Sequence, residues 1–133
     1  MTDSTHPHFD DGGAVRWHAD LTEALREAGA DQRLVFIEYG REQCTQCKDL
    51  VLNVIPREEI RTLLGERFVC LAADCDASDD EVDEIAAKLD GAEMLPFVMV
   101  TDARGQYLDG LSGRIDVDAL HRLLERLSEA ASA

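Results

Sequence analysis

The sequence predicts an α/β layer sandwich, and three observations lead to this fold class. Short runs of β-favouring apolar residues alternate with stretches whose apolar residues recur at helical spacing. A strand–turn–strand pattern and a final helix then close the chain. The 133 residues contain no internal repeat and no dividing linker, so the chain fits one domain. Strands that alternate with helices in this order build a sheet that helices cover.

Four stretches have the composition of strands. Residues 34–39 and 67–73 are nearly continuous apolar runs, which is typical of strands buried on both faces. The segments "PFVMVT" and "YLDGL" are joined by "DARGQ", in which Gly105 occupies the turn position that requires a positive φ angle. These last two strands are therefore expected to pair as a hairpin.

Five stretches have apolar residues at helical spacing, namely residues 21–29, 44–55, 58–64, 82–89 and 116–127. Gly29 and Gly65 are expected to end the first and third of these helices. Pro56 should end or kink the second helix, because its ring removes a backbone donor. Eight acids crowd residues 74–90, and we interpret them as the solvated face of the fourth helix.

The formal net charge is -15, from 28 acidic and 13 basic residues. This charge repels phosphate backbones and anionic membrane surfaces, so neither nucleic acid nor a membrane is an expected partner. No basic and apolar leader opens the sequence, and no apolar run is long enough to span a bilayer. We therefore expect a cytoplasmic protein.

The first 13 residues are polar and contain a glycine pair. We interpret residues 1–13 as a flexible N-terminal tail, and residues 14–133 as the folded domain. His6 and His8 fall within this tail, so the sequence assigns them no role.

Cys44 and Cys47 stand three residues apart at the expected start of the second helix. Backbone amides at a helix N-terminus stabilise an anion, so the thiolate is favoured over the thiol at Cys44. Cys47 lies one turn later on the apolar stripe, from which it could resolve a mixed disulfide made by Cys44. In a cytoplasmic protein such a pair more often serves catalysis, sensing or metal binding than a structural disulfide.

Glu38 interrupts the first apolar strand, six residues before Cys44, at a position that the pattern predicts to be buried. An ionised carboxylate is costly to bury. Such a group near Cys47 could exchange a proton with the leaving thiol. The alternative is an edge residue that reaches solvent.

Pro96 opens the third predicted strand, a position at which proline is tolerated. A cis bond between Leu95 and Pro96 would expose neighbouring backbone groups for pairing with an extended substrate. An ordinary trans bond is the alternative.

Two further cysteines and a methionine have simpler interpretations. Cys70 is expected to be a small core residue, and Met94 is expected to fill the core. Cys75 stands among aspartates, which should raise the pKa of its thiol and lower its reactivity.

A metal site made of four cysteines is the alternative to redox chemistry. However, Cys70 and Cys75 should point to opposite sides of an extended segment, which disfavours a shared ion.

Three motifs resemble the thioredoxin superfamily, namely "LVFIEYGREQCTQCK", "MLPF", and "GLSGR" before the last helix. The order of the elements between about Val15 and Leu127 is also similar. Trp17 followed by "DLTEAL" resembles the small single-domain thioredoxin-like proteins that carry a C-x-x-C-K motif. The resemblance implies a thioredoxin-like three-layer α/β/α sandwich with a central mixed sheet.

The resemblance also implies catalytic roles. It makes Cys44 the nucleophile, Cys47 the resolving thiol and Glu38 the buried acid. Chemistry of this kind takes place between sulfur atoms of the protein and the substrate, so no cofactor and no metal are expected.

A substrate-binding surface is implied next to these residues. The resemblance places Pro96 there as a cis-proline, beside Leu95, with Gln43, Thr45 and Gln46 around the cysteine pair. Gln43 stands where the family usually has tryptophan, and Thr45 and Gln46 differ from the family's usual Gly-Pro or Gly-His.

We interpret the chain as a thiol-disulfide oxidoreductase that reduces or exchanges disulfides in proteins or small molecules. Its expected partners are disulfide-containing protein substrates and a reductase or thiol that donates electrons, and the expected state is a monomer. The alternative is a non-catalytic redox sensor or protein-binding module with the same fold, and a metal-binding protein is the third interpretation.

Overall fold

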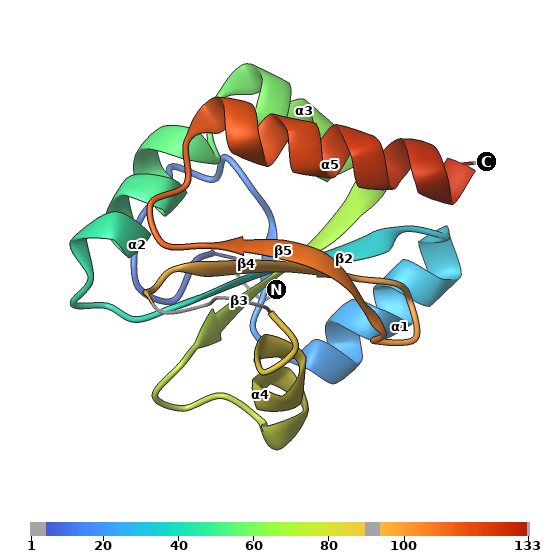
Figure 1. The fold of residues 1–133 in the computed structure, drawn as a ribbon, viewed down its shortest axis with the longest axis horizontal. Helices are drawn as coiled ribbons and strands as arrows, with labels where there is room; N and C mark the ends of the chain where they lie inside the picture. Colours follow the sequence, from blue (N-terminus) through green and yellow to red (C-terminus); the bar gives the residue numbers. More distant parts are fainter. Residues whose placement is uncertain (1–4, 90–93, 133) are drawn as a thin grey trace.

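The computed structural model describes residues 5–89 and 94–132. Within these residues the chain forms a five-stranded mixed sheet in the order β1-β3-β2-β4-β5 (Figure 1). The strands are β1 (Trp17–His18), β2 (Leu34–Gly40), β3 (Phe68–Asp74), β4 (Phe97–Thr101) and β5 (Tyr107–Ser112). β1 and β2 run parallel to β3, whereas β4 is antiparallel to both β2 and β5. The mixed sheet confirms the predicted fold class.

Helices cover both faces of the sheet. They are α1 (Leu21–Asp31), α2 (Thr45–Asp49), the π-helical η1 (Leu50–Val54), α3 (Glu58–Arg67), α4 (Asp80–Ala86) and α5 (Val117–Ser132). α3 and α5 lie on one face, and α1 and α4 lie on the other (Figure 1). Each face has its own apolar core, the first built with η1, α3 and α5 and the second with α1 and α4. The result is the expected three-layer arrangement.

Two helices continue past the glycines that were expected to end them. α1 runs through Gly29 to Asp31, and α3 runs through Gly65 to Arg67. α1 ends instead after Asp31, where the C-cap residue Gln32 has a left-handed φ angle of 57°. The backbone N–H of Arg33 then donates a hydrogen bond to the carbonyl of Ala28 at 2.9 Å. Both predicted helix ends are wrong, because each glycine occupies an open surface position in the helix, where it costs stability but breaks no hydrogen bond.

The helix after the cysteine pair changes its winding. α2 passes into η1, in which the amide of Ile55 bonds to the carbonyl of Leu50 at 2.9 Å, five residues earlier. The predicted apolar stripe is nevertheless buried, comprising Cys47, Leu50, Val51 and Val54. The predicted end at Pro56 is confirmed, since a new helix begins only at Glu58. This segment therefore anchors the cysteine pair in the first core.

Strand β1 was not predicted from the sequence. It contains only Trp17 and His18, which pair with Cys70 and Leu71 of β3. Two residues are too few to show an alternating pattern, so this strand exists through pairing alone.

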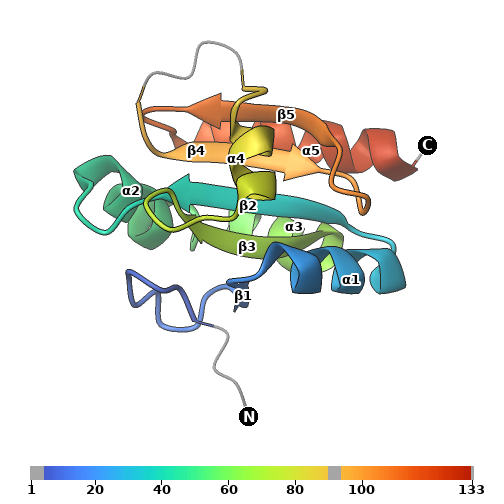
Figure 2. The same ribbon diagram turned by 90° about the horizontal axis from the view of Figure 1, so that it is seen from below.

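The N-terminal segment, residues 5–13, lies on the β1 side of the sheet (Figure 2). His6 is only 6% exposed, and His8 Nε2 lies 3.2 Å from Asp74 Oδ2 at the end of β3. The interpretation of His6 and His8 as tail residues is therefore wrong. Their imidazoles find partners on β2 and β3 that lie far away in the sequence. The division of the chain between residues 13 and 14 stays a prediction.

The helices that the structure describes do not include one that is both long enough and apolar enough to cross a bilayer.

Candidate redox site

Cys44 and Cys47 form a disulfide where the chain passes from β2 into α2. Their Cα atoms lie 5.2 Å apart. Cys44 caps α2 from an extended conformation, and its Sγ accepts a hydrogen bond from the backbone N–H of Cys47 at 3.2 Å. Cys47 is completely buried, whereas Cys44 is partly exposed. An incoming sulfur atom can therefore reach Cys44 but not Cys47.

Glu38 lies in the middle of the sheet. It is 2% exposed and pairs in register with Ala72 of β3 and with Val98 of β4. The prediction that this acid is buried is confirmed. The edge alternative is wrong, because β2 has a hydrogen-bonded strand on each side.

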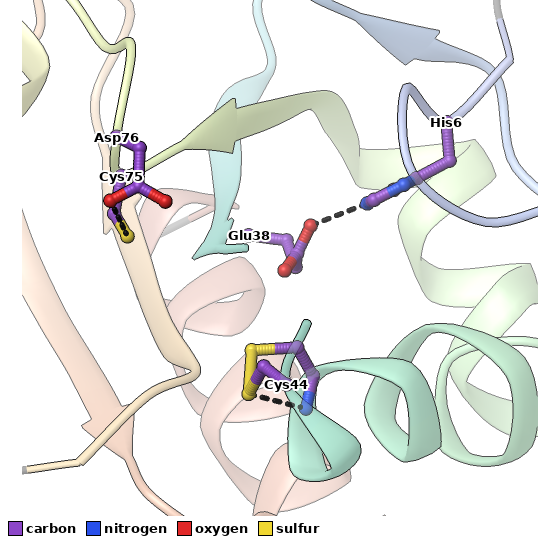
Figure 3. Close-up of a disulfide and its surroundings, with 6 residues drawn as sticks. His6, Glu38, Cys44, Cys75 and Asp76 are labelled. Carbon is purple, nitrogen blue, oxygen red and sulfur yellow. Dashed lines mark hydrogen bonds and ion pairs between the residues drawn. A yellow bond between two sulfur atoms is a disulfide. The ribbon is translucent and has the colours of Figure 1, made fainter. Parts of the chain in front are cut away.

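The Glu38 carboxylate lies between a histidine and the disulfide (Figure 3). Its Oε1 is 2.6 Å from His6 Nε2. Its Oε2 faces Cys47 across Gly40, because a Cβ atom placed on Gly40 would be 2.8 Å from both Glu38 Oε2 and Cys47 Sγ. The two atoms are thus no further apart than twice this distance, which is within reach of proton transfer through one water molecule.

Gly40 provides the space between the acid and the sulfur, so Gly40→Ala is expected to destabilise the protein. The added methyl would overlap two buried atoms, and such overpacking costs about 1–3 kcal/mol. Urea denaturation measures the change in the free energy of unfolding. Gly65→Ala is the matched control, because its methyl would meet open space on α3. That variant should gain about 0.5–1 kcal/mol. Equal effects of the two variants would contradict the close approach at Gly40.

A surface groove opens in front of Cys44. It is lined by strand ends, by the loops that follow β3 and precede β4, and by the segment that leads from β2 into the first turn of α2. The lining residues are Tyr39, Arg41, Gln43, Cys44, Thr45, Gln46, Cys75, Met94, Leu95 and Phe97. Four of the predicted substrate-binding residues are thus beside Cys44. Pro96 does not line the groove, but its bond to Leu95 is cis, so the trans alternative is wrong.

Met94 is not a core residue. Its side chain is 56% exposed and borders the groove, so the expectation that it fills the core is wrong. It precedes β4 and therefore lies outside the buried run from Val98 to Thr101. Beside it, the rings of Tyr39 and Phe97 stack with their centroids 5.5 Å apart. The groove thus has an apolar wall beside a polar one.

Cys70 and Cys75 are free cysteines. Cys70 lies in the first core, where burial strongly raises the pKa of its thiol. Burial is also the main cause that raises the pKa of Cys75, with Asp76 and Asp74 adding to it and Arg41 opposing it. The predicted rise of the Cys75 pKa is confirmed, although burial contributes more to this rise than the aspartates do. Both thiols are poor nucleophiles as a result.

Metal ligands cluster at one place in the part of the chain that the structure describes. Asp74, Cys75 and Asp76 offer ligand atoms within 4.8 Å of one another. Cys44, Cys47 and Cys70 do not belong to this group. The structure therefore does not bring the four cysteines together, and it offers no support for the four-cysteine metal site.

The comparison with known families agrees with this geometry. A family model described as thioredoxin-like matches residues 16–103. The chain belongs to the thioredoxin-like family. The matched part of this thioredoxin-like protein contains Glu38, both cysteines of the pair and Pro96, whereas His6 lies outside it.

Solved structures share the fold of this thioredoxin-like chain at low sequence identity. A thioredoxin from Thermus thermophilus has a TM-score of 0.73 and 20% identity, covering 90% of this chain and 92% of that one. A disulphide isomerase from Xylella fastidiosa Temecula1 has a TM-score of 0.65 and 17% identity, covering 93% and 98%. A poplar thioredoxin h has a TM-score of 0.60 and 21% identity, covering 84% and 95%. No curated protein matches the chain.

Proposed function

We propose that this thioredoxin-like protein is a thiol-disulfide oxidoreductase that uses Cys44 and Cys47 as its redox-active pair. One observation carries the proposal: the two cysteines form a disulfide in which Cys44 borders an open groove and Cys47 is completely buried. A reversible exchange reaction needs this division between an accessible sulfur and a shielded one.

The first step is an attack by the reduced form of the protein. The Cys44 thiolate attacks one sulfur of the substrate disulfide, and a new disulfide forms between Cys44 and the substrate. The other substrate sulfur leaves as a thiolate and takes up a proton from solvent. The hydrogen bond from the Cys47 amide to Cys44 Sγ supports this step, because a donor aimed at sulfur stabilises its anionic form.

The second step releases the substrate. The buried Cys47 thiol passes its proton to the Glu38 carboxylate, and the resulting thiolate attacks Cys44 Sγ. The Cys44–substrate bond breaks, the second substrate thiolate leaves, and the Cys44–Cys47 disulfide forms. Two electrons have then moved from the protein to the substrate, and an external thiol returns them in the next cycle.

The groove suggests how a substrate docks. Its apolar wall includes the exposed Met94 and the stacked rings of Tyr39 and Phe97. Leu95, which precedes Pro96, also lines the groove. We therefore propose that an extended disulfide-containing segment binds along the wall, with its disulfide over Cys44.

Trapping of a mixed disulfide tests the proposal. Cys47→Ser removes the resolving thiol, so the variant should accumulate an adduct with a peptide disulfide that mass spectrometry maps to Cys44. Wild-type protein supplied with dithiothreitol should turn the same peptide over without accumulating the adduct. Absence of turnover by the wild type, or an adduct on Cys75 instead of Cys44, would contradict the proposal.

A further inference from the structure

We propose that His6 is a positioning residue for Glu38, and that it acts as a neutral imidazole whose Nε2–H donates to the carboxylate. This inference rests on the proposed function, since it concerns how the buried acid serves Cys47. Three observations support it: the hydrogen bonds of the imidazole, the aromatic rings packed against it, and the position of the second carboxylate oxygen of Glu38.

The hydrogen bonds of His6 fix which ring nitrogen holds the proton. Nδ1 lies 3.1 Å from the backbone nitrogen of His8 and 3.3 Å from that of Phe9, and both of these N–H groups can only donate. Nδ1 must therefore be the acceptor nitrogen, and the proton belongs on Nε2. The 2.6 Å contact with Glu38 is then an N–H donated to Oε1.

Aromatic contacts hold the imidazole in this orientation. The His6 ring stacks on Phe9 at 5.3 Å and meets Trp17 edge-on at 5.1 Å, measured between ring centroids. The His6 side chain is 1% exposed. Trp17 is itself held by a hydrogen bond from its Nε1 to Asp11 Oδ2 at 2.9 Å. The N-terminal segment thus brings an N–H donor of fixed orientation to Glu38 Oε1.

This donor has two consequences for Glu38. A hydrogen bond to a carboxylate favours its charged form, and a carboxylate must be charged to accept the Cys47 proton. The bond also occupies Oε1, which leaves Oε2 on the side of the disulfide (Figure 3). A Cβ atom placed on Gly40 would be 2.8 Å from this oxygen and from Cys47 Sγ. His6 therefore sets both the charge and the direction of the proton acceptor.

The same hydrogen bonds prevent His6 from passing a proton from Glu38 to another group. To relay a proton onward, the imidazole would have to release or accept one at Nδ1, where two backbone N–H groups already point. A proton taken from Cys47 thus stays on Glu38 until it returns past Gly40. In the part of the chain that the structure describes, the titratable groups found close to the Glu38 carboxylate are His6 and, after reduction, Cys47, and its strand neighbours Ala72 and Val98 are apolar.

Three variants separate positioning from simple structural support. His6→Leu removes the donor, His6→Gln keeps an amide N–H near the place of Nε2, and His8→Gln changes the neighbouring histidine, whose side chain bonds Asp74 instead of Glu38. A single-turnover reaction with a peptide disulfide follows release of the second substrate thiol over a pH series. We expect His6→Leu to slow this step about tenfold at pH 7, the equivalent of one lost hydrogen bond to a charged group.

The pH series identifies the cause of the loss. Rates of His6→Leu should recover as the pH rises, because hydroxide from solvent then takes the Cys47 proton that the carboxylate accepts in the wild type. His6→Gln should lie near the wild type. His8→Gln should stay much closer to the wild type than His6→Leu does, because it keeps the backbone N–H that His6 accepts and removes only an edge contact between the two rings at 5.7 Å. A pH-independent loss, or equal losses in the leucine and glutamine variants, would overturn the positioning role in favour of structural support.

Imidazole NMR tests the inference apart from activity. Long-range ¹H–¹⁵N spectra of the ¹⁵N-labelled wild type at pH 7 should show His6 as the Nε2–H tautomer. An Nδ1–H tautomer or an imidazolium would overturn the inference even if the protein is an oxidoreductase. The expected tautomer in a protein that shows no disulfide turnover would instead locate the failure in the proposed function.

Discussion

Cys44→Ser is expected to reduce disulfide turnover to the rate of the uncatalysed reaction with dithiothreitol. Serine keeps the size and the capping position of the side chain, but its hydroxyl does not ionise near neutral pH and does not attack a disulfide. Coupled reduction of insulin or of a fluorogenic peptide disulfide measures the effect. This is the largest change that we expect from any single substitution.

Cys75→Ser is the comparison variant for this experiment. Cys75 borders the same groove, but it is a free cysteine and burial raises the pKa of its thiol. That variant should retain turnover, although contacts with the substrate can alter KM. Turnover that survives Cys44→Ser but not Cys75→Ser would reverse the assignment of the nucleophile.

Glu38→Gln is expected to give the second largest effect, and only on the second step. The amide keeps the shape of the side chain and an oxygen that can accept from His6, but it cannot take a proton from Cys47. Loss of a general base slows a proton-dependent step by about 10²-fold or more. Formation of the mixed disulfide should continue, so rapid quenching should show this adduct accumulating on Cys44.

The stability of Glu38→Gln distinguishes catalysis from misfolding. A buried ionised carboxylate costs desolvation energy that the neutral amide avoids. The free energy of unfolding in urea should therefore not fall with the activity. A loss of both the first and the second step, together with a large loss of stability, would contradict a role of Glu38 in proton transfer.

Much of the site could be predicted because it depends on local spacing. Cys47 follows Cys44 by one helical turn and shares its face with Leu50 and Val54, so periodicity alone places it in the core. Glu38 stands out because a charge interrupts an apolar strand. In both cases the signal lies within a few residues of the side chain it concerns.

The partner of Glu38 could not be predicted in this way. His6 lies 32 residues earlier in the chain, in a polar segment that has no helical or strand pattern. Its burial depends on a ring cluster with Phe9 and Trp17, and Trp17 belongs to β1, which pairs with the distant strand β3. The concentration of aromatic and imidazole rings in "HPHF" is the one sequence signal that could have indicated a packed segment.

Errors at helix ends and in the groove have the same origin. Glycine is a residue type typical of helix C-caps, but α1 and α3 continue past Gly29 and Gly65, because tertiary contacts outweigh this preference. Methionine is a residue type common in protein cores, yet Met94 lies in the loop before β4, where no periodic pattern applies. Residue type gives only a weak preference at such positions, and packing decides the outcome.

A site-resolved redox titration would test the central claim most directly. Wild-type protein is equilibrated across a series of dithiothreitol ratios, alkylated, and analysed by mass spectrometry at each cysteine. We expect Cys44 and Cys47 to titrate together as one two-electron couple, while Cys70 and Cys75 remain reduced throughout. A Cys44–Cys47 pair that never forms a disulfide in solution, or a disulfide that links Cys44 to Cys75, would contradict the redox site described above.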